Sequence, residues 1–149
     1  MLKKIIGTIW RKLPPAARQL IVRSTQEKFT VSVTGIITNE ADEILLLEHV
    51  LRPASGWGVP GGFIEAGEQP EAGLRREIRE EISLELENVK LLRVRTIRRH
   101  IEILFSAEAV GTPVVSSREI KDFGWFEFDS MPKGMSRFQK ATIENFLKK

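Results

Sequence analysis

The sequence contains no cysteine among its 149 residues. This absence excludes disulfides, thiolate zinc sites and cysteine nucleophiles, and it is typical of a reducing compartment, so we expect a cytoplasmic protein. A long apolar run is also missing, because the longest aliphatic stretch, residues 44–47, is far shorter than the roughly 18 residues of a membrane-spanning helix. No small-residue cleavage site follows the charged N-terminus, which argues against a secretory signal.

The composition is that of an ordinary globular protein, with 42% hydrophobic and 29% charged residues. The sequence shows no internal repeat and no low-complexity tract, so disordered and fibrous classes are excluded. A chain of this length can bury about two-thirds of its unfolded surface in one core. We therefore expect one core and no second full domain.

Acidic side chains are missing from the first 26 residues, although the whole chain carries 20 of them against 23 basic ones. The six basic residues of this segment are Lys3, Lys4, Arg11, Lys12, Arg18 and Arg23. The net charge of +3 is therefore uneven, since residues 1–26 carry +6 and the remainder of the chain sums to −3.

The same segment has the spacing of an amphipathic helix. Its apolar residues recur at helical intervals: Leu2, Ile5, Ile6, Ile9, Trp10 and Leu13. Pro14 and Pro15 interrupt the pattern, because the residue before a proline leaves the α region, while a proline fits the first turn of a new helix. We predict helices near 2–12 and 15–24, and we divide the chain into a basic helical extension (1–26) and a main domain (27–149).

The apolar face of this extension is expected to be buried against another surface. We expect it to pack on the rest of the chain or on a second subunit, which would give a homodimer. The alternative is a membrane surface, since an apolar face with Trp10 opposite a Lys/Arg face matches interfacial helices. Nucleic acid is not expected as a partner.

The main domain alternates between strand and helix signals. Period-two alternation or continuous apolar runs predict strands near 29–37, 43–48, 86–99, 101–110 and 124–128. The first two form a predicted hairpin around a polar turn, and crowded glycine and proline predict a loop with short extended pieces at 53–62. A central helix is predicted at 71–82, and Ser136 is expected to cap a last helix. The order predicts an α/β fold, a mixed sheet sandwiched between helices.

Three glutamates stand at i, i+3 and i+4 of the central helix: Glu77, Glu80 and Glu81. This spacing places their carboxylates on one face, with Cβ atoms about 5–6 Å apart, where they repel one another unless a cation joins them. Carboxylates without thiolate or imidazole partners form a hard-oxygen site, which suits Mg²⁺ or Mn²⁺ better than zinc or copper. On its own, such a cluster is more often a solvated surface.

The glycine-rich turn before this helix completes a longer pattern. From Gly62 the chain runs through five residues to Glu68 and seven more to Arg76, which opens the sequence REIREEISL. This resembles the Nudix box, GX5EX7REUXEEXGU with U a bulky apolar residue, at eight of its nine specified positions, with Ser83 in place of the last glycine. The resemblance extends over roughly residues 29–132.

The resemblance implies a Nudix-type α/β/α sandwich and a set of site residues. The implied metal ligands are the carbonyl of Gly61 and the carboxylates of Glu77, Glu80 and Glu81. Arg76 and Glu68 match the family's supporting ion pair, in which the arginine also steadies the neighbouring carboxylate. The general base differs among family members, so Glu77, Glu80 and Glu119 all qualify, and we favour Glu80.

The implied activity is hydrolysis of a diphosphate linkage in a nucleoside diphosphate derivative. A bound Mg²⁺, or Mn²⁺, would neutralise phosphate oxygens and activate the attacking water. The alternatives are a non-catalytic module that binds or senses a nucleotide, and a Nudix protein held at a membrane surface by residues 1–26. The substrate-binding residues stay open, because the chain has no tyrosine, and no proline within 85–100, where family subgroups carry their signatures.

Several single residues carry smaller expectations. Ser83 is expected at a positive φ, where serine costs about 1 kcal/mol relative to glycine, and Gly73 is expected to let the helix pack tightly on the sheet. His49 and His100 are expected in structural or surface roles. Four aromatic residues could stack on a base but are more often core residues: Trp57, Phe63, Phe105 and Phe123.

Overall fold

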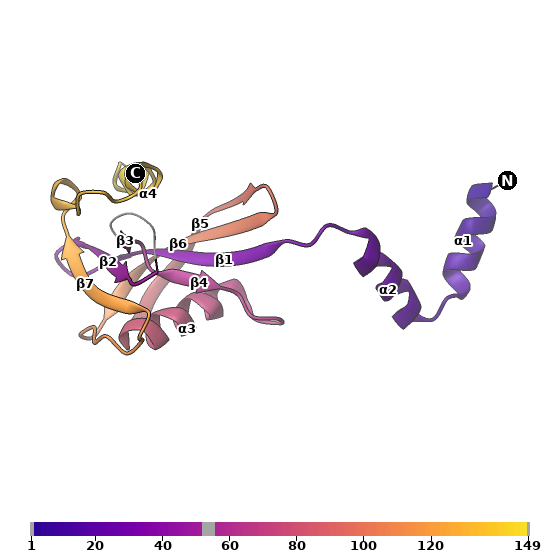
Figure 1. Cartoon of the computed structure of the whole chain (residues 1–149), viewed down its shortest axis with the longest axis horizontal. Helices are drawn as coiled ribbons and strands as arrows, with labels where there is room; N and C mark the ends of the chain where they lie inside the picture. The colour runs from indigo at the N-terminus through magenta and orange to yellow at the C-terminus, as the bar shows by residue number, and fades with distance from the viewer. Residues whose placement is uncertain (1, 52–55, 149) are drawn as a thin grey trace.

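The computed structural model describes residues 2–51 and 56–148. Its elements in chain order are α1 (Leu2–Lys12), α2 (Pro15–Thr25), β1 (Thr30–Thr38), β2 (Ile44–His49), β3 (Trp57–Gly58), β4 (Gly61–Phe63), α3 (Pro70–Ile82), β5 (Glu85–Ile97), β6 (His100–Val110), β7 (Ile120–Phe126), a 3₁₀ turn (Phe128–Ser130) and α4 (Arg137–Leu147). Figure 1 shows α3 and α4 on opposite faces of the sheet, with α1 and α2 extending away from it. None of the helices in these two ranges is long and apolar enough to span a membrane.

Seven strands of the described ranges form one mixed sheet. Five lie in the order β3-β2-β1-β6-β5, while β4 pairs with β1 and β7 pairs with β2. β1 and β6 are parallel along the whole of β1, from Thr30↔His100 to Thr38↔Glu108. The other strand pairs are antiparallel, and they include the predicted hairpin of β1 and β2. The mixed sheet expected from the sequence is confirmed.

β2 is buried on both faces, which explains its unbroken apolar sequence. Leu45 and Leu47 pack in a core with Ile78 of α3. Ile44 and Leu46 belong to a second core, which includes the buried isoleucine of α4. Because successive side chains of a strand point to opposite faces, one four-residue run supplies two cores. The α/β/α sandwich is therefore confirmed.

The C-terminal end of α3 lies at Ser83, which adopts the left-handed conformation with φ 52° and ψ 34°. The Ser83 N–H donates to the Arg79 carbonyl at 3.0 Å, and the Ser116 N–H, from the loop before β7, donates to the Glu81 carbonyl at 2.9 Å. The hydroxyls of Ser83 and Ser116 lie 2.5 Å apart. These bonds satisfy carbonyl groups that a helix end leaves without an intrahelical partner. The positive φ expected for Ser83 is confirmed.

Three local expectations are wrong. β7 begins at Ile120 rather than near residue 124. Ser136 occupies the position before α4, but its side chain forms no capping hydrogen bond to a described residue. Gly73 makes room for the Glu68 carboxylate, whose Oε2 lies 3.0 Å from the place of a Cβ atom, and not for the sheet. Of the loop predicted at 53–62, residues 53–55 lie outside the described ranges.

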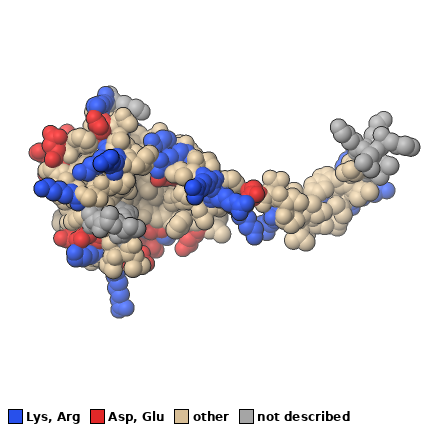
Figure 2. All heavy atoms as spheres, turned by 45° about the horizontal axis from the view of Figure 1, so that its top comes forward, with Lys and Arg blue, Asp and Glu red and all other residues tan. Residues whose placement is uncertain are grey.

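The N-terminal arm, residues 2–25, projects from the sheet and its covering helices (Figures 1 and 2). The two predicted helices are present as α1 and α2. Yet α2 contains no buried residue, and Ile6 and Ile9 of α1 are each 57% exposed. The expectation that the apolar face packs on the rest of the chain is therefore wrong for these residues.

Candidate functional site

Two glycines of β4 form the floor of the site. β4 pairs with β1 so closely that a Cβ atom on Gly61, which has a φ of 140°, would overlap the backbone of Val33. A Cβ atom on Gly62 would overlap the carboxylate of Glu77. Glycine at both positions thus lets the α3 carboxylate lie directly against the main chain of β4.

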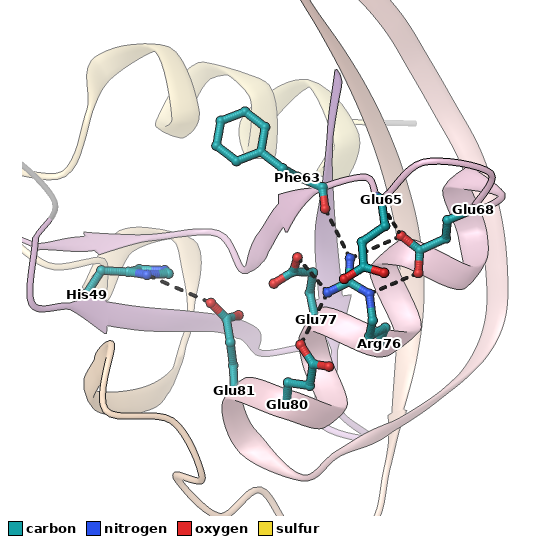
Figure 3. A network of polar contacts seen from close by, with 8 residues as sticks. All are labelled: His49, Phe63, Glu65, Glu68, Arg76, Glu77, Glu80 and Glu81. Atoms are coloured by element: carbon teal, nitrogen blue, oxygen red, sulfur yellow. Dashed lines mark hydrogen bonds and ion pairs between the residues drawn. The ribbon is translucent and has the colours of Figure 1, made fainter. Parts of the chain in front are cut away.

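Arg76 joins α3 to the loop that precedes it (Figure 3). Its Nε and Nη2 donate to the two carboxylate oxygens of Glu68 at 2.9 and 3.1 Å. Nη1 donates to Glu77 at 2.9 Å and to Glu80 at 3.2 Å, and Nη2 also donates to the Phe63 carbonyl at 3.0 Å. The ion pair expected between Glu68 and Arg76 is present, and so is the support that Arg76 gives to the neighbouring carboxylate.

The surroundings of these groups shift their proton affinities in different directions. The hydrogen bond from Arg76 lowers the pKa of Glu68, and the Glu65 N–H, which donates to Glu68 at 3.1 Å, acts in the same direction. The pKa of Glu77 is raised because burial disfavours its charged form, although Arg76 opposes this effect. The same bonds, above all that to Glu68, raise the pKa of Arg76. Arg76 therefore remains positively charged between two carboxylates whose pKa values are shifted in opposite directions.

Glu81 lies on the other side of the cluster, buried at 7% exposure. Its Oε1 is 3.9 Å from Nδ1 of His49, the last residue of β2, and Figure 3 shows the two side chains facing each other. The expectation of a structural or surface role missed the place of this histidine beside the glutamates. No local sequence signal marks His49, because its position depends on how β2 crosses the C-terminal end of α3.

Glu119 is not a member of the Arg76 network. It is exposed in the loop before β7, and its carbonyl accepts the Val50 N–H at 2.9 Å, which places it next to the end of β2. Within the described ranges, its carboxylate belongs to no cluster of three or more acidic or histidine side chains. The structure therefore brings Glu68, Arg76 and two of the three predicted ligand glutamates of α3, Glu77 and Glu80, into one network but leaves Glu119 outside it.

The four aromatic residues divide into core and surface. Phe105 is buried, and Phe123 packs against the α3 core. Trp57 packs edge-on against Phe126 with ring centroids 5.3 Å apart. Phe63, directly after the glycine floor, is 63% exposed, so it alone of the four offers a largely open ring within the described ranges. His100 lies against it edge-on and is held by the hydroxyls of Thr30 and Ser32.

A family model described as NUDIX domain matches residues 28–146. The chain belongs to the Nudix family. The match contains the whole sheet, α3 and nearly all of α4, and it begins just after the N-terminal arm.

The chain is similar in sequence and in structure to several named Nudix proteins. The chain is 34% identical over 110 residues to an ADP-ribose pyrophosphatase of Methanocaldococcus jannaschii, covering 69% of this chain and 64% of that protein. It is 30% identical over 124 residues to the 8-oxo-dGDP phosphatase NUDT18 of Mus musculus, covering 79% and 38%. The chain thus spans less than two-thirds of the length of these relatives. A solved MutT NUDIX hydrolase from Burkholderia pseudomallei matches with a TM-score of 0.69 and 28% identity, covering 79% of this chain and 98% of that one.

The Nudix box of this chain supplies a donor set that fits a hard divalent cation. All of its side-chain donors are carboxylates, and the Gly62 cradle brings Glu77 against the main chain next to Gly61. As placed here, no three acidic or histidine side chains of the described residues converge on one point, since Arg76 bonds Glu77 and Glu80 while Glu81 faces His49. Glu80 is the most exposed of the three predicted ligand glutamates of α3, since its side chain is 62% exposed.

Proposed function

We propose that this chain is a Nudix hydrolase that cleaves a diphosphate linkage in a nucleoside diphosphate derivative. The observation that carries the proposal is the network in which Arg76 ties Glu68 to Glu77 directly above the Gly61–Gly62 floor. The names of the relatives support the substrate class, since one is a pyrophosphatase of ADP-ribose and another a phosphatase of 8-oxo-dGDP. We further propose that residues 27–149 form the catalytic domain and residues 1–26 a separate extension.

In this proposal, Mg²⁺, or Mn²⁺ in its place, is held by the carbonyl of Gly61 and the carboxylates of Glu77, Glu80 and Glu81. When bound, such an ion neutralises phosphate oxygens and makes an attacking water more acidic. Arg76 and Glu68 position Glu77 without touching the substrate, because their bonds fix the orientation of the carboxylate above β4.

We assign the general base to Glu80. Its side chain is 62% exposed and reaches solvent, where the attacking water must enter. Glu77 has the raised pKa that suits a base, but its carboxylate is wedged between Arg76 and Gly62. Glu119 lies outside the network. Loss of a positioned base typically reduces the rate by about 10²–10⁴-fold.

The test is a panel of ADP-ribose, NADH and 8-oxo-dGDP with Mg²⁺, in which phosphate-containing products are quantified for the wild type and for Glu80→Gln. We expect turnover of at least one compound by the wild type and a loss of about 10²-fold or more in the variant. The matched control is Glu85→Gln, which removes an exposed carboxylate paired with Arg79 just beyond α3, and its turnover should stay within about twofold of wild type.

Two results would contradict the proposal. Equal turnover by wild type and Glu80→Gln would remove Glu80 from the reaction. If the wild type turned over no compound but bound one of them in calorimetry, the chain would be a nucleotide-binding module. Thermal unfolding is an independent test. The unfolding midpoint of the wild type should rise as the Mg²⁺ concentration increases, and that of Glu80→Gln should rise less.

A further inference from the structure

The N-terminal arm presents apolar side chains that no described residue covers. Ile6 and Ile9 of α1 are each 57% exposed, and three successive residues of α2 are exposed as well: Leu20 at 70%, Ile21 at 42% and Val22 at 45%. Burial of exposed apolar surface lowers the free energy by about 25 cal/mol per Å². Two consecutive helices with uncovered apolar residues therefore indicate a partner surface.

The charge of the arm restricts what that partner can be. Residues 1–26 contain six basic residues and no acid. The helical period places Arg11 on the side of α1 opposite Ile6 and Ile9. A second copy of this chain would bring equal positive charge against positive charge, and a nucleic acid would meet the basic side but leave the apolar side uncovered.

The basic surface continues onto the sheet where the arm joins it. The tip of the β5–β6 hairpin holds Arg98 and Arg99, and the Arg99 carbonyl accepts the Thr30 N–H at 3.0 Å. The Arg99 side chain pairs with Glu27 at 2.6 Å. Ile97, just before them, is 44% exposed. Figure 2 shows Lys and Arg gathered at this junction. The hairpin tip thus places basic and apolar residues side by side, as α1 does, with Glu27 neutralising one of its arginines.

We propose that the arm binds the surface of an anionic lipid bilayer. α1 lies in the interface with Ile6 and Ile9 toward the acyl chains, while Arg11 and Lys12 contact acidic headgroups. An amphipathic helix with an apolar stripe and a basic face has the two contacts that such a surface offers. This inference does not rest on the proposed hydrolase function, because neither α1 nor α2 contributes a residue to the Arg76 network.

The experiment is co-sedimentation of the full chain with vesicles of phosphatidylcholine alone or with about 30% phosphatidylglycerol. We expect binding to the anionic vesicles only, weakened by salt. The double variants Ile6→Ser/Ile9→Ser and Arg11→Glu/Lys12→Glu should each bind at least about tenfold more weakly, since one removes apolar burial and the other reverses two charges. The matched control Lys133→Glu/Arg137→Glu makes the same charge change on the exposed residues before and at the start of α4, and it should bind within about twofold of wild type.

The other partners are distinguishable outcomes. Equal binding to neutral and anionic vesicles, or to neither, would overturn the proposal. Tighter binding to a single-stranded RNA than to anionic vesicles, retained by Ile6→Ser/Ile9→Ser, would instead assign the arm to nucleic acid. Light scattering without lipid would reveal a dimer. If Ile6→Ser/Ile9→Ser made that dimer dissociate, the arm would be assigned to contact with a second copy and the lipid proposal would be overturned.

Discussion

α3 and α1 are both short amphipathic helices rich in charge, but they differ in how far the rest of the protein covers their apolar faces. The apolar residues of α3, such as Ile78 and Ile82, are fully buried under the sheet, whereas Ile6 and Ile9 of α1 are 57% exposed. Each arginine of α3 pairs with a glutamate, while the first 26 residues contain no acid at all. Periodicity thus predicts that a helix forms and which of its faces is apolar. Whether the apolar face is buried depends on a complementary surface elsewhere.

The largest difference should appear when one isoleucine of each helix is truncated. Ile78→Ala in α3 removes a fully buried side chain and should lower the free energy of unfolding by about 2–5 kcal/mol. Ile9→Ala in α1 should change it by less than about 0.5 kcal/mol, because its side chain is largely exposed already. Denaturant unfolding of both variants measures the contrast. A large loss in Ile9→Ala would mean that α1 is covered in the folded protein.

Glycines of the two regions should respond oppositely to alanine. In Gly62→Ala the new methyl group displaces the Glu77 carboxylate, and we expect turnover to fall by about 10–100-fold. Gly7→Ala in α1 meets no described atom within 4 Å and should stabilise the helix by about 0.5–1 kcal/mol without affecting turnover. Hydrolysis assays and helix content by circular dichroism check the pair. Wild-type turnover in Gly62→Ala would show that the cradle has no catalytic importance.

The ends of the helices offer a smaller effect. Pro14 lies two residues beyond the end of α1, whereas α3 is followed by Ser83, which has a φ of 52°. Glycine adopts this conformation at lower cost than serine does. Ser83→Gly should raise the free energy of unfolding by about 0.5–1 kcal/mol, as measured by denaturant titration. Ser116→Ala controls for loss of the paired hydroxyls. A decrease in Ser83→Gly larger than that in Ser116→Ala would contradict the strain argument.

The smallest predicted effect is a change in pH dependence. The pKa of Glu68 is lowered in the folded protein, so the stabilisation it provides is present above its unfolded pKa and is lost as the pH falls through that value toward the folded pKa. The thermal midpoint of Glu68→Gln should therefore decrease less than that of the wild type between about pH 5 and pH 3. Parallel midpoint curves for the two proteins would show that the Arg76 bond leaves the proton affinity of Glu68 unchanged.

Much of the site could be predicted because its key contacts are local. Arg76 lies eight positions after Glu68, and Glu77 and Glu80 lie within about one turn of that arginine. The spacing along one helix and its preceding loop therefore sets the network. The strands were predictable for a similar reason, since the apolar run 44–47 has no interruption and must be buried on both faces.

Three of the misses depend on how segments fold against one another. His49 approaches Glu81 only because β2 crosses the end of α3. β7 starts early because Ile120 pairs with His49 across the sheet, a register that its own sequence does not specify. The room beside Gly73 is filled by Glu68 rather than by the sheet, which depends on how the loop folds back. Such positions follow from tertiary structure and leave no periodic signal.

The parallel pairing of β1 with β6 has a consequence for how the chain folds. It joins Thr30 to His100, 70 positions along the chain, and everything from the glycine floor to the end of α3 lies inside the loop that it closes. Long-range closures of this kind are slow, because chain entropy is lost before the contacts are gained. A nascent polypeptide that ends before β6 already carries every residue of the Nudix box, yet it lacks the central strand pair against which that segment is ordered. The ordered Nudix domain is therefore expected to form late in biosynthesis, only after the second half of the sheet has emerged.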